Sequence, residues 1–273
     1  MPSRLSVALK WLVVSAAILV LIGWLIITPP GLFGKADAIG YAVCHRIDAR
    51  SFHLGERQLP LCVRCSGMYL GATLGLIFQS VIGRRRGGAP HWKVILPLGL
   101  LAIAFGVDGA NSYLYLIKET YPGAISLPNL YMPNHILRLL TGSGMGLGIA
   151  VALFPAFNQT VWADCQDLPA LTGLKSLGIL LALTLVLDLA MLTENPILLF
   201  PLALISAAGV LVLLTMIYSM VWAMIMRLEN RFTSLAQMWL TLTAGFTLAL
   251  LQIALIDLLR FWLTGTWGGF PLR

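Results

Sequence analysis

Seven long apolar stretches constrain the fold of this chain more than any other feature. They cover approximately residues 11–28, 66–83, 94–113, 134–155, 175–192, 197–226 and 235–259. Each is close to the ~20 residues that an α-helix needs to cross the hydrocarbon core of a bilayer. That core contains no water, so a spanning segment must satisfy its backbone polar groups within its own helix. The sequence therefore predicts an all-α, polytopic transmembrane helix bundle of about seven spans, in a single membrane domain covering residues 1–273.

The composition excludes a soluble globular protein. Charged residues make up only 11% of the chain and hydrophobic residues 59%, whereas a soluble domain carries about 25% charged residues. The predicted solvent and partner is therefore the lipid bilayer. The net charge of +7 then reflects topology and contact with anionic head groups. No nucleic-acid binding is predicted, because the basic run at residues 84–86 is too short for a nucleic-acid footprint.

Short basic segments predict the orientation of the bundle. They lie at alternate ends of the predicted spans and contain Arg4, Lys10, Arg84, Arg85, Arg86, Lys93, Lys175, Arg227 and Arg231. If the helices alternate in direction, all of these residues fall on one side, and the positive-inside rule makes that side the cytoplasm. We therefore expect a multi-pass protein of the cell membrane with a cytoplasmic N-terminus.

The predicted first outer loop, residues 29–65, departs from the positive-inside rule. Its basic residues are Lys35, Arg46, Arg50, Arg57 and Arg64, and its acidic residues are Asp37, Asp48 and Glu56. An excess of positive charge on the outer side is disfavoured in short loops. We therefore expect this cysteine-rich extracytoplasmic loop to have a specific role.

The loop contains the densest group of chemically reactive residues in the chain. Cys62 and Cys65 are separated by two residues, a spacing that lets two thiolates bind one ion, and Cys44 and His45 precede them. Zinc prefers tetrahedral sets of Cys and His ligands. The sequence therefore predicts a metal site of Cys44, His45, Cys62 and Cys65, with zinc as the ion. Neighbouring side chains in an extended segment point to opposite faces, so His53 is an alternative to His45.

Two other interpretations of these cysteines stay open at this point. They can be small buried apolar residues that bind no ion. Alternatively, the chain is a membrane thiol–disulfide oxidoreductase, in which Cys62 and Cys65 exchange with a disulfide, Cys44 resolves it and a quinone accepts the electrons. Convergence of Cys44 and a histidine on the pair favours metal, whereas two exposed cysteines beside a cavity favour redox chemistry. Cys165 lies in a predicted inner loop and is not expected to take part.

Ionisable residues near the outer ends of the predicted helices indicate a polar pocket. A charge in the hydrocarbon core costs ~2.5–3.5 kcal/mol or more, so each should have a partner. At a rise of ~1.5 Å per residue, five such residues fall within roughly 10 Å of the outer surface. They are Asp108, His135, Arg138, Asp188 and Asp257. The predicted pocket consists of Arg50, Arg64, Asp108, His135 and Arg138.

Within this pocket, Asp108 and Arg138 are the predicted buried ion pair. A pocket of this kind also suits an ion path, which gives a third functional hypothesis, an ion or small-solute transporter. Glycines at four-residue spacing, among them Gly67 and Gly71 in one stretch and Gly142 in another, predict close packing of the second and fourth apolar stretches. This packing would bring the cysteine pair toward Arg138.

Several motifs resemble those of a known family. They are Cys44-His45-Arg46, Arg50-Ser51-Phe52, the run from Leu59 to Gly71, Asp108, and the run from Arg138 to Gly142. The family consists of uncharacterised integral membrane proteins of bacteria and archaea, grouped under a domain of unknown function. The resemblance covers about residues 40–145. It implies a multi-spanning fold with a cysteine-rich motif, and it implies no known reaction.

Overall fold

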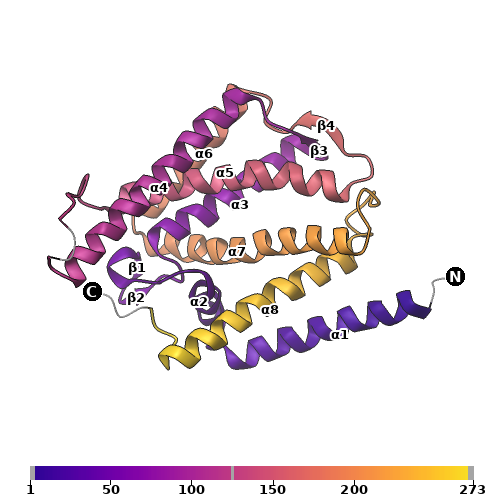
Figure 1. The fold of residues 1–273 in the computed structure, drawn as a ribbon, viewed down its shortest axis with the longest axis horizontal. Helices are drawn as coiled ribbons and strands as arrows, with labels where there is room; N and C mark the ends of the chain where they lie inside the picture. The colour runs from indigo at the N-terminus through magenta and orange to yellow at the C-terminus, as the bar shows by residue number, and fades with distance from the viewer. Residues whose placement is uncertain (1–3, 124–125, 270–273) are drawn as a thin grey trace.

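The computed structural model describes residues 4–123 and 126–269 of the chain. In this part of the chain, seven helices are long and apolar enough to span a membrane. They are α1 (Arg4–Ile27), α3 (Val63–Gly83), α4 (Trp92–Thr120), α5 (His135–Val161), α6 (Leu174–Leu192), α7 (Pro196–Ile225) and α8 (Trp239–Thr264). The predicted all-α bundle with seven spans is confirmed (Figure 1).

Local sequence signals set several helix ends. Asn134 precedes α5, and its side chain accepts a hydrogen bond from the Leu137 N–H at 2.9 Å, which satisfies one of the free donors of the first turn. Asn195 caps α7 in the same way, with Pro196 at the first helical position. Helix α8 ends at Gly265, which has a φ of 67°, a left-handed conformation that glycine adopts without strain.

The non-helical segments gather at the two ends of the bundle. One end carries the 3₁₀ turn η1 (Asp48–Arg50) and the antiparallel hairpin of β1 (His53–Leu54) and β2 (Arg57–Gln58). The other end carries β3 (Arg86–Gly88) and β4 (Gln166–Pro169), which pair in parallel. Figure 1 shows the two small sheets at opposite ends, with the long helices between them.

Helices α3 and α5 pack against each other along their length, as the glycine spacing predicts. A Cβ atom added at Gly67 or Gly71 would collide with the backbone of α5, and one added at Gly142 would collide with the Arg64 carbonyl of α3. Successive glycines along α3 meet successive residues along α5, so the two helices run parallel. Their N-terminal ends therefore lie together, at the end of the bundle that carries the cysteine loop.

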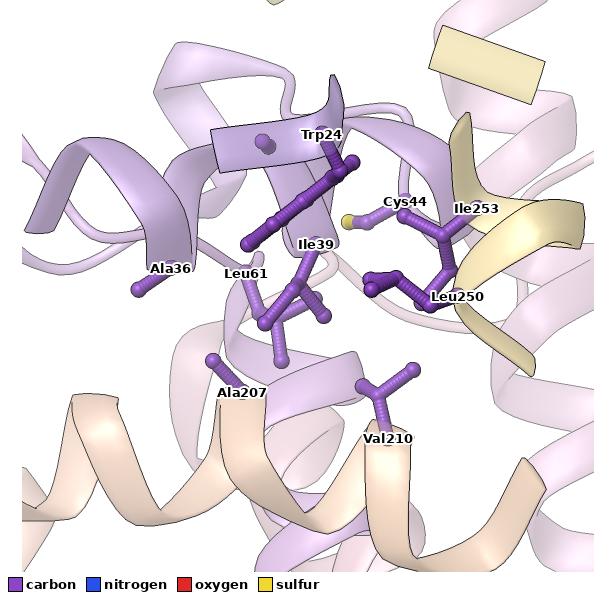
Figure 2. Packing of buried hydrophobic residues seen from close by; sticks show 10 residues of the cluster. Trp24, Ala36, Ile39, Cys44, Leu61, Ala207, Val210, Leu250 and Ile253 are labelled. Atoms are coloured by element: carbon purple, nitrogen blue, oxygen red, sulfur yellow. The ribbon is translucent and has the colours of Figure 1, made fainter. Parts of the chain in front are cut away.

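A short helix, α2 (Gly31–Val43), forms where the sequence predicts a loop. It is too short to cross a bilayer. Its Gly40 lies against the Pro60 carbonyl, where no side chain would fit. Figure 2 shows α2 packed beneath Trp24 of α1, with Ile39 and Cys44 in one apolar cluster with residues of α7 and α8. The segment between α1 and α3, which the sequence predicts as the first outer loop, is thus a folded cap built on this cluster.

Candidate metal centre

Three cysteines from two helix ends converge at this end of the bundle. Cys44 follows the last residue of α2, Cys62 immediately precedes α3, and Cys65 lies in the first turn of α3. Their sulfur atoms all lie within 4.8 Å of one another, and none of the three forms a disulfide. The structure thus brings together three of the four predicted metal ligands.

Backbone geometry holds Cys44 against the start of α3. The Cys44 sulfur accepts hydrogen bonds from the Arg46 N–H and the Cys62 N–H, each at 3.4 Å. Arg260 of α8 donates to the Cys44 carbonyl at 2.7 Å and to the Tyr41 carbonyl at 2.5 Å. The side chain of Cys44 is buried, whereas Cys62 and Cys65 are partly buried. The cluster is therefore fixed from α2, α3 and α8.

The cysteines share hydrogen bonds that shift their protonation in opposite directions. Hydrogen bonds from the thiols of Cys62 and Cys65 hold the pKa of Cys44 well below its usual range, although burial acts against this. The hydrogen bond to Cys44, together with burial, raises the pKa of the Cys62 thiol to about 12. Among the three thiols, these hydrogen bonds therefore favour the charged form most at Cys44. A bound metal ion supplies the positive charge that deprotonates a coordinating thiol.

Neither predicted histidine lies in the cysteine cluster. The His45 side chain is exposed and lines a pocket of about 200 Å³ with Ala42, Val43, Cys44 and Arg260. The His53 Nε2 instead lies 2.9 Å from Asp48 Oδ1. Cys44 has an extended backbone, with φ of −134° and ψ of 147°, so its side chain and that of His45 leave the chain in different directions. A histidine as the fourth ligand stays a prediction.

Asp108 is paired with Arg64, and the predicted ion pair between Asp108 and Arg138 is wrong. Arg64 donates to the Asp108 carboxylate and also to the Asp108 carbonyl, at 3.1 Å. The Tyr131 hydroxyl donates to the other carboxylate oxygen at 2.8 Å. The physical reason is the contact between Gly142 and the Arg64 backbone, which fixes the first turn of α3 where the Arg64 side chain can reach Asp108 on α4.

The other predicted pocket residues lie close to this pair. Arg50 donates to the Ser112 carbonyl of α4 at 2.9 Å. The His135 ring nitrogen Nε2 lies 3.4 Å from the Ala49 carbonyl oxygen. Arg138 is buried, and its charge acts on those of Arg50, Arg64 and Asp108. The predicted pocket residues are thus neighbours.

Two further acids and one base have partners that the sequence did not indicate. Asp188 accepts a hydrogen bond from Ser143 at 2.6 Å, and Asp257 accepts one from Trp24 at 3.4 Å. Sequence analysis also missed Arg260, whose contacts with Tyr41 and the Cys44 carbonyl cross more than 200 positions of the chain. No local pattern could have revealed these pairings, because each depends on which helices become neighbours.

Comparisons with known proteins place this chain in a family. The family model described as "Predicted membrane protein (DUF2085)" matches residues 44–152. An uncharacterised protein of Methanothermobacter thermautotrophicus is 32% identical over 109 residues, which are 40% of this chain and 82% of that protein. The chain belongs to the DUF2085 family. A second uncharacterised protein, from Methanocaldococcus jannaschii, is 25% identical to this DUF2085 protein over 125 residues, 46% of this chain and 70% of the relative. No solved structure matches the chain.

The family match contains the residues of the candidate centre. In this DUF2085 protein the matched segment begins at Cys44 and includes α3, α4 and most of α5. It therefore contains all three clustered cysteines, the ion pair of Arg64 and Asp108, and Arg138. Cys165 lies outside the match, in the segment between α5 and β4.

Proposed function

We propose that this DUF2085 membrane protein binds one zinc ion through the thiolates of Cys44, Cys62 and Cys65. The convergence of three free cysteine sulfurs within 4.8 Å supports the proposal. Zinc–thiolate bonds of ~2.3 Å in a tetrahedral site imply sulfur–sulfur separations of roughly 3.8 Å. The three side chains therefore need only small rotations to surround an ion.

Three protein ligands leave one position of a tetrahedral zinc ion for a fourth group. The pocket of about 200 Å³ beside Cys44 supplies room for it, and His45 lines that pocket. We assign the fourth position to His45 because it lines this pocket beside Cys44; the backbone after Cys44 would have to turn to bring the His45 ring to the ion. His53 is the less suitable candidate, because its Nε2 already lies beside Asp48.

The centre is proposed to face the outside of the cell membrane. The segments between α3 and α4, between α5 and α6 and between α7 and α8 carry basic residues at the opposite end of the bundle. The positive-inside rule assigns that end to the cytoplasm. A closed zinc site at the outer end would lock α2 and the following cap onto α3, which is a structural role.

The test combines metal analysis with thiol counting on protein purified in mild detergent. The wild-type chain should contain about one zinc per molecule, as expected for a single tetrahedral site, and Cys62→Ser should lose it. Cys165→Ser is the matched control, because Cys165 is also a free, partly buried cysteine. His45→Ala should weaken zinc binding more than His53→Ala. Stoichiometric zinc in Cys62→Ser would refute the proposal.

A membrane thiol–disulfide oxidoreductase is the second candidate. It is favoured by one observation, that the Cys62 and Cys65 sulfurs at the start of α3 lie within 4.8 Å of each other and of the Cys44 sulfur, a third thiol that could resolve a disulfide. In that function the two thiols would form a disulfide, and the two electrons and two protons released would reduce a quinone to a quinol. Zinc-free protein with two thiols missing from the count would favour this candidate.

A further inference from the structure

Arg138 is a buried cation whose guanidinium group has no hydrogen-bond or ion-pair partner among the residues that the structure describes. It lies in the first turn of α5 and is only 7% exposed. In residues 4–123 and 126–269, no hydrogen bond or ion pair reaches its guanidinium group, and its Nε atom is completely buried. An arginine side chain keeps its proton in proteins, so Arg138 cannot escape this situation by becoming neutral. Such a buried charge costs free energy unless something compensates it.

The charges nearest to Arg138 make its situation worse. Arg50 and Arg64 are the two charges that act on it most strongly, and both are positive. Arg50 and Arg64 also converge on a single residue of α4, since Arg50 donates to the Ser112 carbonyl at 2.9 Å and Arg64 to the Ser112 hydroxyl at 3.0 Å. Arg138 lies one helical turn before Gly142, which packs against the Arg64 backbone, so three arginines from η1, α3 and α5 gather at the start of α5.

One carboxylate cannot balance this group. Asp108 pairs with Arg64 and accepts a further hydrogen bond from Tyr131, so its oxygens are already engaged. Within the described part of the chain, neither Arg50 nor Arg138 has an acidic side chain within ion-pair distance. The three arginines and Asp108 leave a local charge of about +2, counting one unit for each group; Glu119 also acts on Arg50 but forms no ion pair with it among the described residues.

Two helix dipoles add to the same positive potential. Helices α3 and α5 run parallel and both begin at this end of the bundle, at Val63 and His135. The N-terminal end of each helix carries a partial positive charge, and anions bind there for this reason. The helix ends alone would not define a site, but here they coincide with an unpartnered buried arginine and two further cations.

We propose that Arg50, Arg64 and Arg138 form a binding site for a phosphate group. Arginine presents planar, paired donors that match the oxygens of phosphate. A dianionic phosphate would balance the local charge, whereas a single carboxylate would leave half of it. The partly exposed side chains of Arg50 and Arg64 provide access from the end of the bundle. The site does not depend on the zinc proposal, because none of the three arginines is a metal ligand.

The phosphate can belong to a soluble anion or to a lipid head group. Arg138 lies only one helical turn from the start of α5, which is about 5 Å along the axis, so it is close to the level of the membrane surface. Both sources present the same terminal phosphate oxygens. The experiment therefore uses inorganic phosphate for the first source and phosphatidic acid for the second.

The test measures binding to the full-length protein, with its thermal unfolding as a second readout. Isothermal titration calorimetry in phosphate-free detergent buffer measures affinity for inorganic phosphate. The lipid arm compares thermal unfolding in phosphatidylcholine nanodiscs with and without phosphatidic acid, because a ligand that binds the folded state raises its stability. Binding in the first arm identifies a soluble phosphate compound, and stabilisation only in the second identifies a lipid head group.

The variants decide whether the arginines form the site. Arg138→Gln should weaken binding at least about tenfold, since it removes a charge-assisted pair. Arg57→Gln is the matched control, because it removes one charge from the same cap but is half exposed and pairs with Asp37; its affinity should stay within about twofold of wild type. If Arg138→Gln does not fold, Arg50→Gln takes its place.

Two results would overturn the proposal. The first is a wild-type protein that neither binds inorganic phosphate nor gains stability from phosphatidic acid. The second is a folded Arg138→Gln or Arg50→Gln variant with wild-type affinity, because binding would then occur elsewhere. Weakened binding in the arginine variants with unchanged binding in Arg57→Gln would support the site.

Discussion

The ion pair of Asp108 and Arg64 gives a quantitative test of how the end of the bundle that carries the cysteine cluster is assembled. The Asp108 side chain is 1% exposed and that of Arg64 is 19% exposed. Removing one partner of a buried pair costs about 3–5 kcal/mol, because it leaves the other charge uncompensated. When the Asp108 charge is removed, the Arg64 side chain is still partly exposed to solvent. It also keeps its hydrogen bonds to the Ser112 hydroxyl and to the carbonyl of residue 108. We therefore expect Asp108→Asn to lower the free energy of unfolding by about 3 kcal/mol, the lower end of that range.

A double-mutant cycle separates this pair from other effects of the substitution. The loss in Asp108→Asn/Arg64→Gln should be smaller than the sum of the two single losses by about 2 kcal/mol, a coupling typical of groups in direct contact. The control cycle uses Asp37 and Arg57, where Arg57 is 51% exposed. A pair of this exposure should show a coupling of ~1 kcal/mol or less.

Equilibrium unfolding in mixed micelles, followed by circular dichroism, supplies the free energies. The reasoning is refuted if the coupling of Asp108 with Arg64 is no larger than that of the control pair. It is equally refuted if Asp108 couples more strongly with Arg138 than with Arg64. Among the described residues, Asp108 forms an ion pair with Arg64 and none with Arg138.

Three further predictions concern packing, charge and topology. Gly146→Val should strongly destabilise the bundle in thermal unfolding, because a Cβ atom at this position would overlap the Met68 carbonyl. Gly148→Ala should be neutral or slightly stabilising, because nothing lies within 4 Å of the added carbon. In phosphate-free buffer, Arg138→Gln should match or exceed the thermal stability of wild type, since it removes a buried charge that has no partner among the described residues. A marked loss of stability would show that the protein itself compensates the charge of Arg138. Reporter fusions between α3 and α4 and between α5 and α6 should report cytoplasm, and a fusion between α4 and α5 the outside; a cytoplasmic signal from the last would reverse the orientation.

The sequence predicted the spans because lipid imposes a simple requirement. A helix that crosses a bilayer must be long and apolar, and both properties are visible in the chain without knowledge of its neighbours. The packing of α3 on α5 was also predictable, since glycines at four-residue spacing mark a face that another backbone can approach. That helix pair places the start of α3, with the cysteine pair, at the same end of the bundle as the start of α5, with Arg138.

The sequence did not predict features that depend on how distant segments meet. Helix α2 is short and lies in a mixed polar segment, so its apolar face became recognisable only once Trp24 and α8 had covered it. The partner of Asp108 was misassigned because Arg64 and Arg138 both begin a helix at the same end, and the sequence alone does not say which points toward α4. The convergence of Cys44 with Cys62 and Cys65 was predicted from their spacing, whereas the position of His45 outside the cluster depends on the extended backbone at Cys44, which no motif specifies.

X-ray absorption at the zinc edge tests the central claim most directly, because it measures the ligands of the ion itself. Protein purified in mild detergent with zinc present should show three sulfur neighbours at ~2.3 Å and one nitrogen or oxygen neighbour at ~2.0–2.1 Å. Cys62→Ser should lose the ion or one sulfur neighbour, while Cys165→Ser should keep the full set. Zinc bound only by nitrogen and oxygen in the wild type, or an unchanged set of three sulfurs in Cys62→Ser, would contradict a metal centre at Cys44, Cys62 and Cys65.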